Sequence, residues 1–413
     1  MAEPLTILIA ARDEEARIGE SISALRRAFP DAEALVADDG SRDGTAAAAE
    51  QAGARVLRLP RLGKGQALTL AEREAPPGAL LLCDADVEGD LAPLLDDGAD
   101  LAIAAFAERQ GGGFGIAKRA ARALVRMLGG FDAREPLSGQ RTLSAAAREE
   151  CFPLAPGFGC EVRMTIDAAR AGLHIEEREL PLRHRATDRD ARGFLHRGRQ
   201  LLDAVLACGP TATNFRGLRL PLVGALLALG GADAPRRVRL GVAAAVALGL
   251  ADDLWSGAER GFRAHLSRGS TTGVAKALGI PLAALAATRS LRAATLVGLA
   301  ANAVNQLDTR PGRALKAFLA GALLVRGPAK AYVPIAVLLA PYDLREMTML
   351  GDAGANGLGA VLGYGSVGKL TGRGQFLAIA ALAGLTAAGE ARSLGALIER
   401  TPVLSQLDRW GRV

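Results

Sequence analysis

The residues best suited to chemistry are acidic, and they follow short apolar runs in the first half of the chain. Asp84-Ala85-Asp86 comes directly after the run ALLLC, and Asp38-Asp39 comes directly after ALVA. Hard cations such as Mg²⁺ prefer oxygen ligands, and Mg²⁺ is commonly held by one or two protein carboxylates together with substrate phosphates. The Asp-x-Asp sequence therefore predicts a metal site that serves a nucleoside diphosphate. A solvated acidic turn is the alternative, because such turns are common on surfaces.

A sheet with helices on both faces is the expected support for these residues. Short apolar runs typical of buried strands lie at residues 5–10, 34–37, 54–59 and 78–83. Between them, apolar residues at Ile18, Ile22 and Leu25 have the spacing of an amphipathic helix, and residues 65–75 have a helical pattern. This alternation predicts an α/β domain with a mostly parallel sheet. The polar loops after three of the strands should then meet at its carboxyl edge, where such sheets bind ligands.

Charge and composition separate the two halves of the 413-residue chain. The net charge is +6, yet residues 1–210 carry more Asp and Glu than Lys and Arg, whereas residues 211–413 carry a clear excess of Lys and Arg. The acidic first half excludes an extended nucleic-acid surface. A hydrophobic content of 50% excludes intrinsic disorder. The cysteines lack zinc-type spacing and are expected to be reduced thiols; they are Cys83, Cys151, Cys160 and Cys208.

Apolar runs rich in Gly and Ala dominate the sequence from Gly209 onward. They lie at residues 218–231, 238–250, 279–287, 291–304, 315–325, 332–341 and 375–389. Small residues permit close helix packing in lipid, and about 17 residues approach the length of a membrane span. We therefore expect an α/β domain over residues 1–209, followed by an all-α polytopic membrane domain over residues 210–413 with about six to eight spans. A soluble Ala-rich helical domain is the alternative.

The positive charge between these runs predicts that the α/β domain lies at the cytoplasmic face of the inner membrane. The basic stretch from Arg183 to Arg199, which contains Phe194 and Leu195, would then be an interfacial link between the two domains. The sequence leaves the oligomeric state open.

Four segments of the first half resemble, in order and spacing, the family 2 glycosyltransferases with the GT-A fold. They are AARDEE (10–15), VADDGSRDGT (36–45), LGKGQA (62–67) and DAD (84–86). The resemblance covers residues 5–90 and implies a nucleotide-sugar donor linked to UDP or GDP. It implies that the donor is bound by Ala11, Asp38, Asp39, Lys64 and Asp84. It also implies that Asp84 and Asp86 hold Mg²⁺ or Mn²⁺, which would neutralise the departing diphosphate.

Two further segments narrow the resemblance to enzymes with anionic acceptors. PLSGQR (136–141) and GFGCE (157–161) resemble the acceptor-side elements of the polyprenyl-phosphate sugar transferases, which include the dolichol-phosphate mannose synthases, and of the glucosyl-3-phosphoglycerate synthases. The resemblance implies that the acceptor phosphate is bound by Ser138, Gln140, His184, Arg185 and Arg189. Arginine suits this role because its guanidinium makes bidentate contacts with phosphate.

Three residues of the first half are expected to take part in catalysis: Asp86, Arg141 and Glu161. An acceptor phosphate is already ionised and needs little help from a base. A hydroxyl acceptor would need Glu161 or another carboxylate to take its proton. The alternative for Glu161 is a structural carboxylate at the N-terminus of a helix.

Polar residues in the apolar second half form another candidate site, because ionisable groups within a membrane are costly. In order and spacing they resemble the polyprenyl-phosphate N-acetylhexosamine-1-phosphate transferases, an integral-membrane family that uses Mg²⁺. The matching residues are Asp252, Asp253, Asn302, Asn305, Asp308 and Asp352. Helix capping is the alternative explanation. Positive charge for lipid phosphates is available at Arg263, His265, Lys276 and Arg313.

This second resemblance is incomplete. Residues 309–313 replace a Gly-Asp-Gly segment that the family usually carries, and the His-rich loop near its end is missing. A domain that only binds polyprenyl phosphate, or a sugar-linked polyprenyl diphosphate, is therefore as consistent with the sequence as a second active site.

The sequence favours a membrane-bound inverting glycosyltransferase that moves a hexose from a nucleotide sugar to a polyprenyl-phosphate or polyprenyl-linked acceptor. One alternative is a bifunctional enzyme whose second half is also an active sugar-1-phosphate transferase. Another is a glycosyltransferase that acts on a soluble phosphorylated acceptor such as 3-phosphoglycerate, with a non-catalytic membrane anchor.

Overall fold

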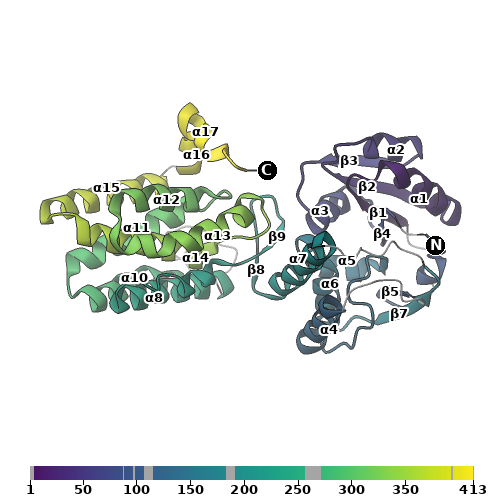
Figure 1. The fold of residues 1–413 in the computed structure, drawn as a ribbon, viewed down its shortest axis with the longest axis horizontal. Coiled ribbons are helices and arrows are strands. Elements are labelled where there is room, and N and C mark those ends of the chain that lie inside the picture. The colour runs from purple at the N-terminus through teal and green to yellow at the C-terminus, as the bar shows by residue number, and fades with distance from the viewer. Residues whose placement is uncertain are drawn as a thin grey trace. The chain divides into compact units, whose positions relative to one another are not determined.

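The chain folds into two compact units, Met1–Pro221 and Leu222–Val413, in a computed structural model. The structure describes residues 4–86, 88–95, 98–106, 115–182, 191–255, 271–391 and 394–412 (Figure 1). The boundary follows Pro221 and not residue 209, because the small antiparallel hairpin of β8 (Thr211–Thr213) and β9 (Arg219–Pro221) belongs to the first unit.

A seven-stranded sheet forms the centre of the first unit. Its strands are β1 (Leu5–Ala11), β2 (Glu33–Asp39), β3 (Arg55–Leu59), β4 (Ala79–Asp84), β5 (Leu101–Phe106), β6 (Arg141–Leu143) and β7 (Ile175–Leu180). Their order is β3-β2-β1-β4-β6-β5-β7, and every neighbouring pair is parallel except the two that include β6. The expected mostly parallel sheet is confirmed, and the antiparallel β6 is an addition to it.

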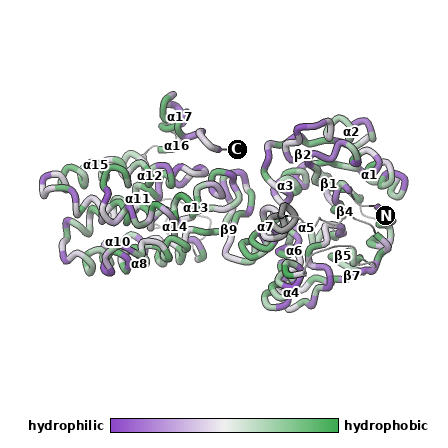
Figure 2. Tube along the Cα trace, viewed as in Figure 1, coloured by the Kyte–Doolittle hydropathy of each residue, from purple (hydrophilic) through white to green (hydrophobic). Residues whose placement is uncertain are grey.

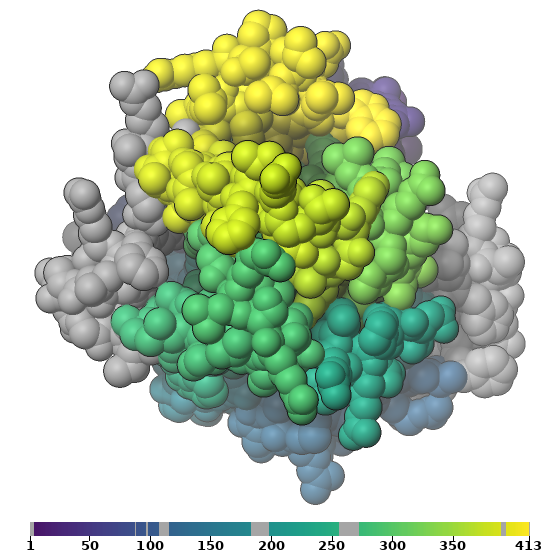
Figure 3. Space-filling model, turned by 90° about the vertical axis from the view of Figure 1, so that its left-hand side faces the viewer, coloured from purple at the N-terminus to yellow at the C-terminus, as the bar shows by residue number. Residues whose placement is uncertain are grey.

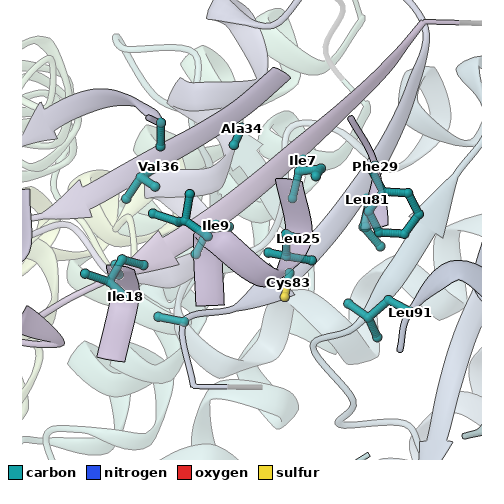
Figure 4. Close-up of a cluster of buried hydrophobic side chains, with 14 of the residues drawn as sticks. Ile7, Ile9, Ile18, Leu25, Phe29, Ala34, Val36, Leu81, Cys83 and Leu91 are labelled. Atoms are coloured by element: carbon teal, nitrogen blue, oxygen red, sulfur yellow. The ribbon is translucent and has the colours of Figure 1, made fainter. Parts of the chain in front are cut away.

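Helices cover both faces of this sheet because its central strands are apolar on both sides. Ile7 and Ile9 of β1 pack with Ile18 and Leu25 on one face (Figure 4). Leu8 points to the opposite face and packs against another set of helices. The helices of the unit are α1 (Glu15–Ala28), α2 (Thr45–Gln51), α3 (Lys64–Glu74), α4 (Ile116–Gly129), α5 (Ala145–Cys151), α6 (Cys160–Arg170) and α7 (Ala191–Cys208), with the short 3-10 helices η1 (Ala92–Leu95) and η2 (Gly157–Gly159).

The register of the parallel strands brings the polar loops to one edge of the sheet. Ala11 at the end of β1 pairs with Asp38 of β2, and Ala10 pairs with Asp84 of β4. The carboxyl ends of β1, β2 and β4 therefore lie side by side. This confirms the expectation that the loops after these strands share one edge.

The second unit is helical, as the sequence predicted. Its helices are α8 (Arg236–Trp255), α10 (Thr271–Thr288), α11 (Leu291–Leu307), α12 (Arg313–Val325), α13 (Val333–Leu344), α14 (Gly351–Lys369), α15 (Gly372–Ala391), α16 (Leu394–Arg400) and α17 (Pro402–Arg409), with η3 (Gly224–Leu229) and η4 (Gly327–Tyr332). Hydrophobic residues recur along α8, α10 and α11 (Figure 2). The apolar run at 218–231 is an exception, since it forms β9 and η3 and no long helix.

Helix α14 lies at the centre of this unit, where it packs against α8, α11 and α12. Its glycines allow this close approach. A Cβ atom on Gly359 would lie 2.4 Å from the carbonyl oxygen of Ala300, and one on Gly363 would lie 2.6 Å from the Cα atom of Val297. The small residues thus permit close helix packing, as expected, whereas packing within a membrane stays a prediction.

Membrane-spanning helices were expected over this region. Among the described residues, no single helix is both long and apolar enough to cross a membrane. Gly372–Gly389 and Leu394–Arg400 together have the length and composition of a membrane span, but the chain bends by 90° between these two segments.

Candidate functional site

The carboxylate of Asp84 lies at the centre of the polar edge, where β4 ends. Its Oδ1 atom accepts a hydrogen bond from Lys64 Nζ at 2.5 Å, and its Oδ2 atom accepts one from Gln140 Nε2 at 3.0 Å. A third of the Asp84 side chain, 33%, is exposed. Asp86 follows in the next turn and is half-buried. Both carboxylates are therefore placed at the edge where ligands bind to parallel sheets.

Lys64 connects Asp84 to the acceptor-side segment of the sequence. It is the first residue of α3, and its Nζ atom lies 2.7 Å from Oε1 of Glu161, which is in the first turn of the distant helix α6. Burial alone lowers the pKa of Lys64, but the charges of Asp84 and Glu161 outweigh that effect and raise it well above its usual value. Lys64 is therefore an ammonium ion held between two carboxylates.

Asp38 and Asp39 shape the neighbouring loops. Asp38 Oδ1 accepts the N–H of Ser41 at 3.0 Å. Asp39 accepts the N–H groups of Leu62 at 2.6 Å and Gly63 at 2.9 Å, directly before Lys64. Burial raises the pKa of Asp39, and these backbone hydrogen bonds oppose the rise. Asp39 thus fixes the start of α3.

Two of the residues expected to bind the acceptor phosphate are buried next to Asp84. Ser138 is 3% exposed and Gln140 is 1% exposed. The residue between them, Gly139, passes so close to Asp84 that a Cβ atom there would lie 2.3 Å from Asp84 Oδ2. The turn therefore supports the Asp84 carboxylate. The other expected acceptor residues, His184, Arg185 and Arg189, lie outside the described residues.

Arg141 was expected to act in catalysis, but the structure places it inside the protein with no exposed surface. Its guanidinium donates to the carbonyl oxygens of Ser138 at 2.7 Å and Pro136 at 3.1 Å, and to the hydroxyl of Thr165 at 2.8 Å. A side chain so enclosed does not reach a substrate. Arg141 therefore stabilises the loop that precedes β6 and does not have the expected catalytic role.

We expect Arg141→Lys to destabilise the first unit by about 2–4 kcal/mol, because one ammonium cannot reach three acceptors and buried oxygens are left unpaired. Urea unfolding, followed by labelling of the buried thiols, measures the loss; Cys83, Cys151 and Cys160 are free and buried. The matched control is Arg119→Lys, an exposed position on α4 where a change within about 0.5 kcal/mol is expected. Equal stability of the two variants would contradict the supporting role.

The polar residues of the second unit separate into two groups. In the first, Lys276 forms ion pairs with Asp252, at 2.5 Å, and with Asp352. Both Asp253 oxygens accept N–H groups at the start of α14, from Asp352 and Ala353, at 2.9 Å each. The lysine expected to serve lipid phosphates is therefore paired with two of the aspartates that carry the second resemblance, Asp252 and Asp352. We assign no catalytic step to these carboxylates.

The second group lies on α11 and at its C-terminal end. Asn302 Nδ2 donates to the Thr386 hydroxyl of α15 at 3.1 Å, and Asn305 Oδ1 is buried without a hydrogen-bond partner. Asp308 follows the helix, where its N–H bonds the carbonyl of Asn305. Arg313, another expected phosphate ligand, is paired with Asp408. Arg263 and His265 lie outside the described residues.

Comparison with known proteins identifies the first unit. Residues 6–142 match the family model for glycosyl transferase family 2. The first unit contains a family 2 glycosyltransferase domain. The chain is also similar to glycosyltransferase AglJ of Haloferax volcanii, with 32% identity over 154 residues that make up 34% of this chain and 51% of that protein. The chain thus spans about half the length of this curated relative.

Solved structures similar to the chain include two of glucosyl-3-phosphoglycerate synthase from Mycobacterium tuberculosis. The complex with phosphoglyceric acid has 26% identity and a TM-score of 0.42, and the match covers 53% of this chain and 86% of that one. The complex with Mg²⁺ and uridine diphosphate has 25% identity and a TM-score of 0.42, over 50% and 79% of the two chains.

The edge of the glycosyltransferase domain fits a divalent cation that a substrate helps to hold. In the part of the chain that the structure describes, no group of three or more His, Cys, Asp or Glu side chains is placed to hold a metal ion. Asp84 and Asp86 nevertheless provide carboxylate oxygens at the ligand-binding edge. Two carboxylates are the usual protein share of a Mg²⁺ site that substrate phosphates complete.

Sequence reasoning missed Asp203 on α7, which organises the turn before Glu161. Asp203 is 5% exposed, and its Oδ2 accepts the N–H of Phe158 at 3.1 Å. Gly157 has a φ of +59°, and a Cβ atom there would lie 2.3 Å from the same oxygen. Burial raises the pKa of Asp203. The sequence offered one signal for this residue. Asp203 is a carboxylate on the apolar face of its helix, one turn before the buried Ala207.

We expect Asp203→Ala to lower the turnover number of the glycosyltransferase by about 10-fold with little change in the KM of the donor, because the displaced turn directly precedes the helix that contains Glu161. Asp203→Asn should restore most of the rate, since its side-chain carbonyl accepts the same Phe158 N–H. Steady-state kinetics of the three proteins test this. An Asn variant as impaired as the Ala variant would show that the hydrogen bond is not the reason.

Proposed function

We propose that the protein is an inverting glycosyltransferase that moves a hexose from a UDP- or GDP-linked sugar to a polyprenyl-phosphate or polyprenyl-linked acceptor at the cytoplasmic face of the inner membrane. The observation that carries this proposal is the convergence of Asp84, Lys64 and Glu161 at the carboxyl edge of a family 2 glycosyltransferase domain. The ammonium group of Lys64 is suited to the phosphates of a ligand, and the carboxylates are suited to a cation that the ligand brings with it.

The donor side of the reaction rests on the loops after β1, β2 and β4. Ala11 and Asp38 are paired in the sheet and would border the base and ribose, and Asp39 holds the start of α3. Asp84 and Asp86 would hold Mg²⁺ or Mn²⁺. When bound, this cation supplies positive charge that stabilises the departing diphosphate.

The acceptor attacks the anomeric carbon from the face opposite the diphosphate. The new bond joins that carbon to an acceptor oxygen, the bond to the diphosphate breaks, and its electron pair leaves with the nucleoside diphosphate. Lys64 provides positive charge fixed in advance at the site where negative charge collects. A phosphate acceptor arrives ionised. For a hydroxyl acceptor, Glu161 would take the proton; its side chain is 6% exposed and is paired with Lys64, so it would first have to leave that pair.

The surface of the second unit supports a lipid acceptor and a membrane location. Among the described residues, all but five of the exposed large apolar side chains belong to this unit. On α10, for example, Leu278 is 61% exposed and Leu282 is 62% exposed. Large apolar surfaces of this kind mark contact with lipid or with another protein. A location in the membrane would bring a long-chain acceptor to the domain that uses it.

The test is a transfer assay on membranes that contain the full chain. Labelled UDP- and GDP-sugars are added with Mg²⁺ or Mn²⁺, lipids are extracted into organic solvent, and the released nucleotide is identified. Label in the lipid phase together with a nucleoside diphosphate supports the proposal, and EDTA should abolish that label. Membranes with the Asp84→Asn variant provide the background.

Two other outcomes would overturn the proposal in different ways. Lipid label released together with a nucleoside monophosphate would show that the second unit is itself a sugar-1-phosphate transferase. If label enters only a water-soluble acceptor such as 3-phosphoglycerate, the acceptor is not a lipid, and the second unit has a role other than binding the acceptor.

A further inference from the structure

The helix α17 has its polar and apolar faces reversed relative to a surface helix of a globular protein. Ser405 and Asp408 point inward and are 9% and 7% exposed. The large apolar residues point away from the protein; we call them the outward apolar face, and they are Val403, Leu404, Leu407 and Trp410. Surface helices normally bury their apolar stripe. The exposed side of α17 therefore needs a covering partner.

The orientation of α17 is fixed by its polar side. Arg313, the first residue of α12, binds both carboxylate oxygens of Asp408, at 3.0 and 2.8 Å, and both side chains are 5% exposed. Lys316 Nζ donates to the Asp408 carbonyl at 2.6 Å, and Arg412 Nε donates to the Pro311 carbonyl at 2.8 Å. Bidentate arginine–carboxylate pairs are geometrically specific. This clamp prevents α17 from turning its apolar side inward.

The surroundings of the outward apolar face are basic. The cations of segments 309–316 and 394–412 are Arg310, Arg313, Lys316, Arg400, Arg409 and Arg412. The carboxylates of the same segments are Glu399 and Asp408. Arg313 is buried against Asp408, but Arg400 and Arg409 are exposed, and exposed cations near apolar side chains match the anionic headgroups and acyl chains of a lipid surface. Trp410, which is 77% exposed at the end of the face, is of the type enriched at membrane interfaces.

We propose that α17 lies in the plane of a membrane that contains anionic lipid, with its outward apolar face at the boundary between headgroups and acyl chains. The C-terminal segment (yellow) lies on the outside of the second unit in Figures 1 and 3, where a lipid surface can reach it. This inference rests on the proposed membrane location of the second unit. It adds that an interfacial helix, tied to α12 by Arg313, sets the level of that unit relative to the headgroups.

Tryptophan fluorescence provides a direct test because the chain has only two tryptophans, Trp255 and Trp410. The Trp255→Phe variant of the full chain leaves Trp410 as the sole reporter. It is reconstituted in bilayers of phosphatidylcholine and phosphatidylglycerol whose acyl chains carry bromine near the headgroup. We expect bromine to quench Trp410 by at least about twofold, and more than bromine near the bilayer centre does.

A second variant tests the apolar face itself. Adding Leu404→Gln and Leu407→Gln to the reporter should remove most of this quenching. Leu202→Gln, at an exposed leucine of the first unit, is the matched control and should leave it unchanged. Equal quenching in pure phosphatidylcholine would contradict the requirement for anionic lipid.

Failure of this inference is distinguishable from failure of the proposed membrane location. If the full chain does not float with vesicles, the membrane location is wrong. If it floats while aqueous iodide quenches Trp410 and bromine does not, α17 lies in water and only the present inference is overturned. If neither agent reaches Trp410, a second copy or another protein covers the face, which also overturns it.

Discussion

Asp84→Asn is expected to lower the rate of sugar transfer by about 10³-fold, because it removes a charge that would hold the cation on the departing diphosphate. Asn is nearly isosteric with Asp, so the fold of the sheet edge should be retained. The same substitution takes away one of the two carboxylates that bind Lys64. Single-turnover transfer with saturating donor and Mg²⁺ measures the loss.

The matched control for this experiment is Asp31→Asn, an exposed aspartate in the loop between α1 and β2. It should transfer sugar at the rate of the unmodified protein. Both variants should associate with membranes equally. Transfer that survives both Asp84→Asn and Asp86→Asn would disprove the assignment of the donor site.

Lys64→Met is expected to lower the rate by about 10²-fold, the usual cost of removing one preorganised electrostatic contact at a site where charge develops. The methionine fills similar volume, but it leaves Asp84 and Glu161 without the cation between them. Two uncompensated carboxylates would then repel the diphosphate, so the KM of the donor should rise as well. Initial rates across a range of donor concentrations separate the two effects.

Lys118→Met provides the comparison, because Lys118 also pairs with a carboxylate, Glu135, but on the partly exposed helix α4. Surface ion pairs contribute little, so a change of at most about twofold is expected there. If Lys64→Met retained an unchanged kcat/KM, Lys64 would have no part in binding the donor.

The strands and the donor edge could be predicted because they depend on local patterns. Apolar runs define β1, β2 and β4, and parallel pairing then forces Asp38 and Asp84 to the same edge. The antiparallel strand β6 could not be predicted in this way. It has three residues, and it begins with a buried arginine in place of an apolar run.

The contacts that complete the site join residues far apart in the sequence. Lys64 and Glu161 are 97 positions apart, and no spacing rule connects them. Arg141 was expected to act in catalysis because arginines usually are exposed, whereas its partners are mainly backbone carbonyls that a sequence does not display. In the second unit, Lys276 was expected to serve lipid phosphate for the same reason, but it forms ion pairs with Asp252 and Asp352.

The central position of α14 has a consequence for how the protein is made. Seven of its 19 residues are glycine, and each glycine disfavours a helix by about 1 kcal/mol relative to alanine, so this helix depends on its neighbours for stability. Its neighbours α8, α11 and α12 all precede it in the chain and are synthesised first. Translation that stops before Gly351 would therefore leave those helices around an unfilled centre, and such a product is expected to be a substrate for cellular proteases.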